Sequence, residues 1–91
     1  MDTFGNRVQR LRKEAGYKTQ LAFLQAVNEA GATLGVSLSQ GRLSELEGGE
    51  NIPNGATVKV IADVLCTSAD YLLLRTDDPT PMVIAYDEAA D

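Results

Sequence analysis

The 91-residue sequence contains no histidine, no tryptophan and a single cysteine, Cys66. Without histidine the chain lacks the commonest general base and the commonest metal ligand, so an enzyme or a metal protein is disfavoured. One cysteine allows no disulfide within the chain, which fits a reducing compartment. We therefore expect a cytoplasmic protein without a cofactor or metal, in which Cys66 packs in the core as a small hydrophobe.

Long apolar runs and aromatic side chains are also scarce. No run approaches the roughly 20 residues of a membrane span, and the N-terminus lacks the apolar core of a signal peptide. Hydrophobic residues make up 44% of the chain but aromatic residues only 5%, so aliphatic side chains must build the core. The length of the chain suits one small domain, and the lack of a long apolar run indicates no membrane partner.

Basic residues are outnumbered, and the formal net charge is -5. The two signs are unevenly distributed along the chain. Residues 1–59 hold seven Lys or Arg against six Asp or Glu, whereas residues 60–91 hold one against seven. The acidity therefore lies in the C-terminal third, and the rest of the chain can still present a thin basic face to a nucleic acid.

Helical periodicity is the main positive signal. Residues 3–15 carry apolar side chains at steps of four, three and four, and Gly16 closes this predicted first helix. On its other side, Arg7, Arg10 and Lys13 are either solvated or in contact with phosphate. A second helix is predicted from the N-cap Thr19 to about Ala30. Its apolar contacts are Leu21, Phe23, Leu24, Ala26 and Val27.

The segment after the second predicted helix contains two glycines and small residues, so we interpret it as a loop. Within it, Leu34, Val36 and Leu38 are expected to pack under the domain. Asn54 is predicted to cap a fourth helix and Ser68 a fifth. The inward stripe predicted for the fourth helix consists of Val58, Ile61, Ala62 and Leu65.

Between these elements lies the stretch LSQGRLSELEGGENIP, which begins at Leu38. Ser39 can act as the N-cap of a short third helix, and Gly48 and Gly49 end it. Leu43 and Leu46 share one face because they are three residues apart. The opposite face is polar and is free to contact a partner, as in a recognition helix. This face carries Gln40, Gly41, Ser44 and Glu45.

The ordered segments resemble the lambda-repressor-like (Xre/Cro-type) helix-turn-helix family over residues 4–78. The resemblance rests on FGNRVQRLR with Arg12, on Gln20 at the start of the second helix, on LSELEGGENIP and on TVKVIADVLCTSADYLL. It implies an all-α, five-helix DNA-binding domain at residues 1–76 with an extended connection between helices two and three. Residues 77–91 would then be an acidic tail or a dimerisation arm.

The resemblance also implies roles for individual residues. Gln20 would reach a phosphate, Gln40 would pair with adenine, and Glu45 would accept from a cytosine amine. Arg12 and Glu47 would form a structural ion pair between the first and third helices. The DNA-binding set implied in this way is Gln20, Ser39, Gln40, Gly41, Arg42, Ser44, Glu45 and Asn51.

Three features depart from the family pattern. About nine extra residues, Glu29 to Ser37, lengthen the connection between helices two and three. Gly41 stands where the family usually has a base-reading side chain, so it either allows close backbone approach or marks reduced base readout. Glu50 stands where the family usually offers a cation, which removes one phosphate contact.

The leading hypothesis is a transcriptional regulator, a repressor of bacterial or prophage type, that binds double-stranded DNA as a homodimer on a palindromic operator. The alternative is a protein-interaction module of the same fold, such as an antitoxin whose acidic C-terminal region docks a small basic toxin. The apolar run from Met82 to Tyr86 is either a dimer arm or a disordered tail. The dimer surface expected from the sequence consists of Tyr71, Leu74, Met82, Val83, Ile84 and Tyr86.

Overall fold

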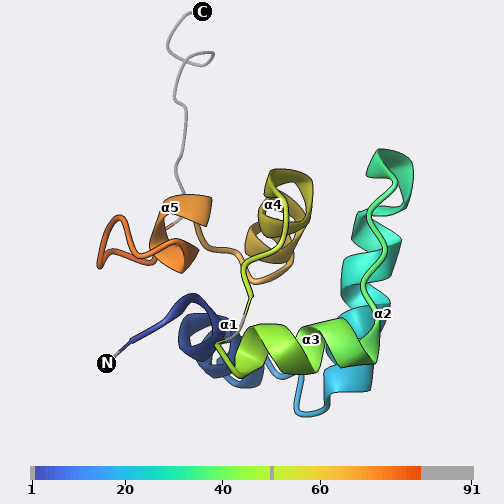
Figure 1. The fold of residues 1–91 in the computed structure, drawn as a ribbon, viewed down its shortest axis with the longest axis horizontal. Coiled ribbons are helices and arrows are strands. Elements are labelled where there is room, and N and C mark those ends of the chain that lie inside the picture. Colours follow the sequence, from blue (N-terminus) through green and yellow to red (C-terminus); the bar gives the residue numbers. More distant parts are fainter. Residues whose placement is uncertain (1, 50, 81–91) are drawn as a thin grey trace, which may run out of the picture.

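The computed structural model describes residues 2–49 and 51–80, which form five α-helices and one short 3₁₀ helix, η1. No strand occurs in these residues, so the all-α class predicted from the sequence is confirmed. Figure 1 shows α3 along the lower edge, α2 rising from its N-terminal end, and α4 and α5 above. The elements are α1 (Phe4–Glu14), α2 (Gln20–Ala30), η1 (Ala32–Leu34), α3 (Gln40–Glu47), α4 (Gly55–Val64) and α5 (Ala69–Leu72).

Each of these five α-helices follows a side chain that accepts a hydrogen bond from the backbone N–H three residues later. This contact satisfies one of the free donors of the first turn. The capping residues predicted from the sequence are confirmed in this role, and Thr3 joins them at the start of α1. The full set is Thr3, Thr19, Ser39, Asn54 and Ser68.

The core is largely aliphatic, as predicted, although Phe4, Phe23 and Tyr71 are also buried in it. It centres on Phe23, Leu43, Leu46, Ile61 and Leu72, none of which is measurably exposed. Burying a side chain of this size is worth about 1.5–3 kcal/mol. The inward stripe predicted for α4 is confirmed, and Val60 of the same helix is buried as well.

The α1 and α3 backbones are in close contact at Gly5. A Cβ at this position would overlap the carbonyl oxygen of Leu46 and would lie 2.9 Å from the carbonyl carbon of Glu47. Only a residue without a side chain fits, so Gly5 sets how closely α1 approaches the helix that carries the polar face.

The connection between α2 and α3 is ordered by Asn28, whose amide pairs with the backbone of Leu38. Asn28 Nδ2 donates to the Leu38 carbonyl at 3.1 Å, and the Leu38 N–H donates to Asn28 Oδ1 at 2.7 Å. Val36 and Leu38 are buried, as expected. The expectation for Leu34 was wrong: it lies in η1, at the turn away from the core, and is 56% exposed.

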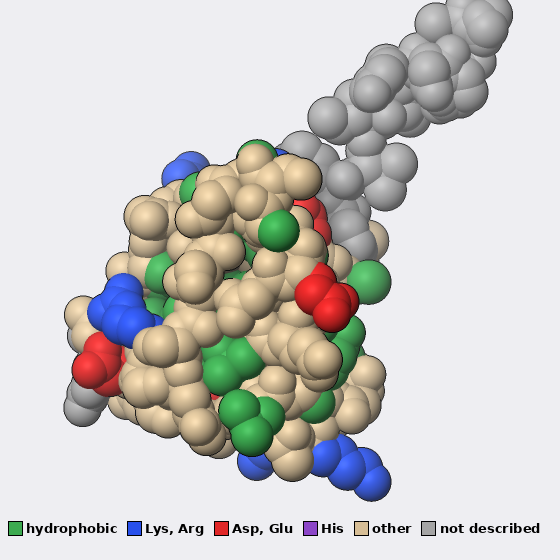
Figure 2. All heavy atoms as spheres, turned by 90° about the vertical axis from the view of Figure 1, so that its right-hand side faces the viewer, with side chains coloured by type: hydrophobic (Ala, Val, Ile, Leu, Met, Phe, Trp, Pro, Cys, Tyr) green, Lys and Arg blue, Asp and Glu red, His purple; other side chains and the backbone are tan. Residues whose placement is uncertain are grey.

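Leu21 was also expected to make an apolar contact, but it is exposed because it lies on the outer side of α2. Figure 2 shows the face to the right of Figure 1, where α2 lies. Lys and Arg side chains reach this face only near its edges, in keeping with their absence from residues 19–41. Residues 19–41 therefore bring no cation to this face, and the charge that they carry is the exposed acid Glu29.

Cys66 does not pack in the core, contrary to the expectation from the sequence. It is exposed and has φ of 56°. It follows α4 as a left-handed residue, and the next N–H, of Thr67, closes the helix end by donating to Ala62 at 2.9 Å. This backbone turn directs the Cys66 side chain outward, although the residue is apolar enough to be buried.

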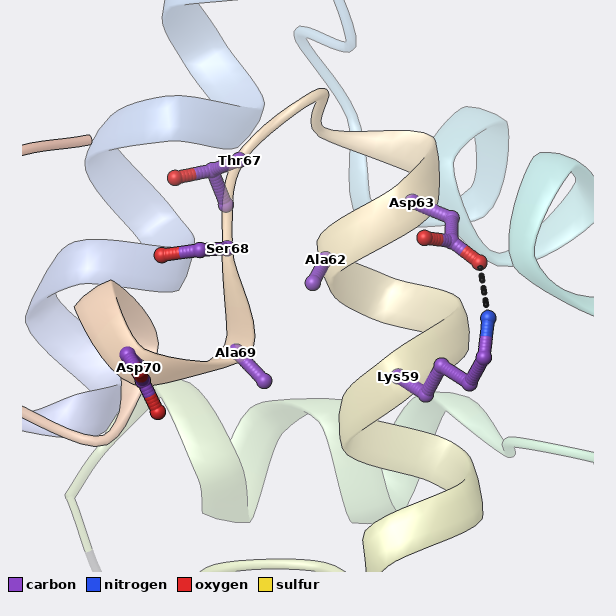
Figure 3. A pocket seen from close by; sticks show the side chains of 7 residues that line it. All are labelled: Lys59, Ala62, Asp63, Thr67, Ser68, Ala69 and Asp70. Carbon is purple, nitrogen blue, oxygen red and sulfur yellow. Dashed lines mark hydrogen bonds and ion pairs between the residues drawn. The ribbon is translucent and has the colours of Figure 1, made fainter. Parts of the chain in front are cut away.

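A pocket of about 270 Å³ lies between α4 and the start of α5 (Figure 3). Its polar groups already have structural partners. Lys59 Nζ donates to Asp63 at 3.0 Å, Ser68 caps α5, and the Thr67 hydroxyl donates to the carbonyl of Pro79 at 2.7 Å. This pocket is part of the α4–α5 corner. No helix in the described part of the chain is long and apolar enough to cross a membrane.

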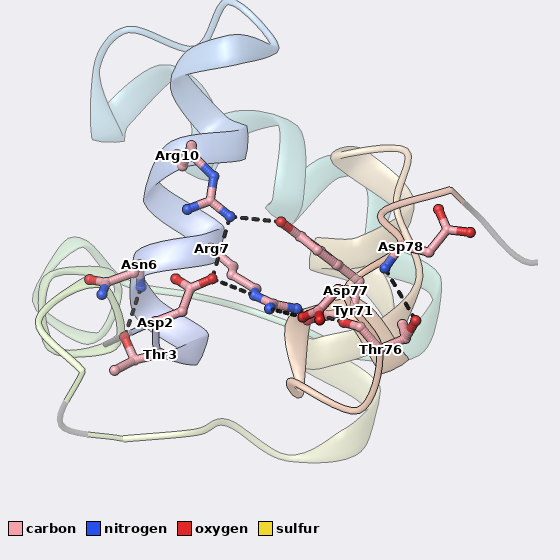
Figure 4. A network of polar contacts seen from close by, with 9 residues as sticks. All are labelled: Asp2, Thr3, Asn6, Arg7, Arg10, Tyr71, Thr76, Asp77 and Asp78. Carbon is pink, nitrogen blue, oxygen red and sulfur yellow. Dashed lines mark hydrogen bonds and ion pairs between the residues drawn. The ribbon is translucent and has the colours of Figure 1, made fainter.

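Arg7 is neither solvated nor available to phosphate, so both interpretations of it from the sequence were wrong. It is 6% exposed and holds the two ends of the described chain together (Figure 4). Its guanidinium donates to Asp2 at 2.7 Å, to the carbonyls of Tyr71 and Thr76 at 2.7 Å each, and to Asp77 at 3.0 Å. These partners lie around Arg7 because α5 packs against α1.

Candidate nucleic-acid interface

The third helix, α3, has one buried side and one open side. Leu43 and Leu46 are fully buried between α1 and α2, and Glu47 is buried beside them. The side predicted to be polar and free is exposed at Gln40, Gly41, Ser44 and Glu45, and Arg42 is exposed as well. The described residues therefore leave a polar helix surface that no part of their own chain covers.

A buried ion pair lies directly under this surface. Arg12 Nε donates to Glu47 Oε2 at 2.7 Å and Nη2 donates to Oε1 at 3.3 Å, and both side chains are about 5% exposed. Arg12 Nη1 also donates to the carbonyl of Tyr17 at 2.8 Å. Burying two charges is tolerable here because their geometry is bidentate and the remaining donor is satisfied.

Gln20 connects this ion pair to the surface. Its Nε2 donates to Glu47 Oε1 at 3.1 Å, and its Oε1 accepts from Ser44 Oγ at 3.2 Å and from Gln40 Nε2 at 3.4 Å. Three residues that were predicted separately as DNA contacts, Gln20, Gln40 and Ser44, thus form one hydrogen-bonded cluster where α2 begins beside α3.

Glu45 is the centre of a second exposed cluster, one turn along α3. Its Oε1 accepts from Arg42 Nη1 and from Asn51 Nδ2, each at 3.4 Å. Arg42 also donates its backbone N–H to the capping hydroxyl of Ser39 at 3.2 Å. A cation and an amide therefore flank the Glu45 carboxylate.

Gly41 lies in the first turn of α3, and nothing lies within 4 Å of the position that a Cβ would take. The glycine is therefore not required by packing within the chain. The helix surface at this point is bare backbone, which allows a partner to approach more closely than any other residue would permit.

The residues expected at a dimer surface differ in their exposure, and several lie outside the described part of the chain. Tyr71 is buried, and its hydroxyl accepts from Arg10 Nη2 at 2.7 Å. Leu74 is 45% exposed and has φ of 66°. Met82, Val83, Ile84 and Tyr86 lie outside the described residues.

Two exposed apolar residues near Leu74 were missed by the sequence analysis. Ile52 follows α3 and Leu73 follows α5, and together with Leu74 and Phe4 they line a pocket of about 280 Å³. Periodicity could not find this patch, because Ile52 lies in a loop and the patch joins segments more than twenty residues apart.

Among curated proteins, the chain is similar to the uncharacterized HTH-type transcriptional regulator YazB of Bacillus subtilis (strain 168). The two are 39% identical over 71 residues, which cover 78% of this chain and 88% of that protein. The chain belongs to the helix-turn-helix transcriptional regulators. No family model matches it, and no solved structure does.

Membership of the helix-turn-helix regulators is consistent with the packing of α2 against α3. The two helices are joined through η1 and a following segment in which Val36 and Leu38 are buried. The contacts between Gln20 of α2 and the surface of α3 form across this connection.

Proposed function

We propose that the chain is a sequence-specific, DNA-binding transcriptional regulator of the lambda-repressor-like type, acting in the cytoplasm with α3 as its recognition helix. The observation that carries the proposal is the uncovered polar face of α3, held rigidly from behind by Leu43, Leu46 and the Arg12–Glu47 pair. Such a helix fits the major groove of B-DNA. Catalysis is no part of the proposal.

In this proposal, Gln20 binds a phosphate at the N-terminus of α2, where free N–H groups favour an anion. Gln40 pairs with adenine through its amide, and Glu45 accepts from a cytosine amine. Arg42 and Asn51 contact the sugar-phosphate backbone. The complete proposed contact set is Gln20, Ser39, Gln40, Gly41, Arg42, Ser44, Glu45 and Asn51.

We further propose that the protein acts as a homodimer on a palindromic operator, because one short helix reads too few bases to define a site. The exposed patch of Ile52, Leu73 and Leu74 supports this. A left-handed backbone conformation is energetically unfavourable for a leucine, and its presence at Leu74 supports a role for this side chain in dimer contacts. Tyr71 is buried, and its carbonyl accepts the Leu74 N–H at 3.1 Å, so its proposed role is to support Leu74. Further proposed contacts are Met82, Val83, Ile84 and Tyr86.

The test is selection from a random duplex pool, followed by affinity measurements at rising salt. We expect a palindromic consensus with half-sites roughly 34 Å apart, bound with an affinity that falls as salt rises. Gln40→Ala should weaken binding to the consensus, whereas Lys59→Ala, at an exposed position of α4, serves as the matched control. Absence of binding even at low ionic strength would overturn the proposal.

A second candidate is a protein-interaction module, in which the acidic C-terminal third docks a small basic protein such as a toxin. The observation that favours it is the charge of residues 60–91, one cation against seven acids. Asp63 and Asp70 are both exposed on the α4–α5 side. Association with a basic protein that is lost in Asp63→Asn/Asp70→Asn would support this role, and unchanged association would count against it.

A further inference from the structure

Glu47 determines which groups donate and which accept in the hydrogen bonds at the α3 surface. Its carboxylate is paired with Arg12 and is about 5% exposed, so it acts purely as an acceptor. Glu47 Oε1 lies 3.1 Å from the Gln20 side chain. The group of Gln20 that faces it must therefore be the NH₂, because an amide oxygen in that place would face a carboxylate oxygen with no proton between them.

The orientation of the Gln20 amide determines what reaches the surface. Its oxygen points away from Glu47 and receives two donors, the Ser44 hydroxyl at 3.2 Å and one N–H of Gln40 at 3.4 Å. The only proton of the Ser44 hydroxyl is thereby used within the protein. Ser44 retains its lone pairs, and Gln40 retains its carbonyl and one N–H.

A serine hydroxyl on a recognition helix is normally ambivalent, because it can rotate to donate or to accept and so contacts any base. A hydroxyl whose proton is committed to Gln20 can only accept. In the major groove, adenine and cytosine present exocyclic amines, whereas guanine and thymine present carbonyl oxygens. An acceptor therefore distinguishes the first two bases from the other two.

We propose that the Arg12–Glu47 pair, acting through Gln20, makes Ser44 an obligate hydrogen-bond acceptor that selects adenine or cytosine at the base it faces. Gln20 and Glu47 are positioning residues in this scheme, and Ser44 makes the contact. This inference rests on the proposed DNA-binding function and assigns to the buried ion pair an effect on specificity in addition to its structural role.

The experiment measures affinity for four duplexes that differ only at the position whose preference disappears in Ser44→Ala. The wild-type protein should prefer adenine or cytosine over guanine or thymine there by roughly threefold to tenfold, as expected for one neutral hydrogen bond. Gln20→Met keeps the side-chain length but removes the acceptor, so this ratio should fall towards one. Gln25→Met, exposed on the same helix, should leave the ratio unchanged.

A second measurement does not depend on the folding of any variant. In the preferred duplex, adenine at this position is replaced by purine, which lacks the exocyclic amine, or cytosine by a pyrimidine that lacks its amine. Wild-type affinity should fall by about the same factor as in Ser44→Ala. An unchanged affinity would overturn the inference.

The outcomes separate this inference from the proposed function. A wild-type protein with no sequence preference at any position would contradict the proposed function itself. A wild-type preference for guanine or thymine opposite Ser44 would overturn the inference alone. A Gln20→Met variant that binds all four duplexes more weakly by one common factor, with the ratio intact, would also overturn it, because Gln20 would then act only as the proposed phosphate contact and would have no part in positioning Ser44.

Discussion

The guanidinium carbon of Arg7 lies 4.1 Å from the centre of the Tyr71 ring, and Nη1 of the same group donates to the Tyr71 carbonyl 2.7 Å away. One side chain of α1 thus holds α5 both through the face of an aromatic ring and through the helix's own backbone. Because Arg7 also binds Thr76 and Asp77, it closes the domain at the point where its described ends meet.

The first prediction concerns this closure. Arg7→Ala should lower the thermal midpoint markedly, because it leaves the carbonyls of Tyr71 and Thr76 without this donor in a nearly buried place. Arg75→Ala is the matched control, since the Arg75 side chain is 75% exposed and lies 4.0 Å from Asp70. Thermal unfolding followed by circular dichroism checks both. Equal midpoints for the two variants would contradict the role given to Arg7.

The second prediction concerns acid. The hydrogen bond from Arg7 holds the pKa of Asp2 below its ordinary value of 3.8. A lowered carboxyl pKa adds stability above the unfolded pKa, and this stability is lost as the pH falls through the folded pKa. The midpoint difference between wild type and Asp2→Asn should therefore be constant from about pH 7 to pH 5 and should shrink below about pH 4.

Thermal melts across this pH range give the check. Asp78→Asn should behave in the same sense, because the Thr80 backbone N–H lowers the pKa of Asp78. A wild-type advantage over Asp2→Asn that grows on acidification would refute the assignment.

The third prediction compares two glycines. Gly5→Ala should destabilise the protein by about 3 kcal/mol, because its Cβ would overlap backbone atoms of α3, which cannot move aside cheaply. Gly41→Ala should stabilise it by about 1 kcal/mol, since the site is open and alanine favours the helix. Denaturant titration measures both values, and a destabilised Gly41→Ala would contradict the open space assigned to this position.

DNA affinity of the same Gly41 variant decides between the two interpretations of this residue. If bare backbone allows close approach, Gly41→Ala should bind DNA more weakly although it is more stable. If the glycine marks reduced base readout, affinity should be unchanged.

The fourth prediction concerns left-handed positions occupied by residues other than glycine. Cys66→Gly should stabilise the protein by about 1 kcal/mol, because glycine removes the clash of a Cβ at φ of 56°. Cys66→Ser keeps the Cβ and should give no gain. Unfolding free energies of the three proteins provide the comparison, and equal gains in both variants would point to the thiol and not to the backbone.

Leu74→Gly should raise the stability of the monomer but weaken its association into a dimer. The monomer should become more stable because φ is 66° at this position, whereas any dimer formed through the apolar patch should weaken. Sedimentation at several concentrations measures association. A dimer unaffected by this change would exclude Leu74 from the interface.

Much of the fold follows from local signals. The caps Thr19, Ser39, Asn54 and Ser68 were predictable because each is a polar residue directly before an apolar stripe. The side chain and the N–H that it binds lie within one helical turn, so the signal is local in sequence. Arg7 could not be interpreted correctly in this way. Its partners Tyr71, Thr76 and Asp77 are more than sixty residues away in sequence, and nothing near Arg7 signals their approach.

For the interface, periodicity was enough to show that Gln40 and Ser44 face outward. Their joint contact with Gln20 was not predictable, because it depends on how α2 meets α3 across the connection that contains η1. Cys66 was misplaced for a related reason. Its hydrophobic character favoured burial, but the backbone turn that ends α4 directs it to solvent.

The account depends most on α3 being the surface that meets DNA. Backbone amide shift changes on addition of the selected duplex to the ¹⁵N-labelled protein test this directly. The account predicts that the largest changes occur at Gln20 and at residues 39–47 and 51, with little change in α4 or at the α4–α5 pocket. Changes concentrated on α4 and α5, with α3 unaffected, would contradict it.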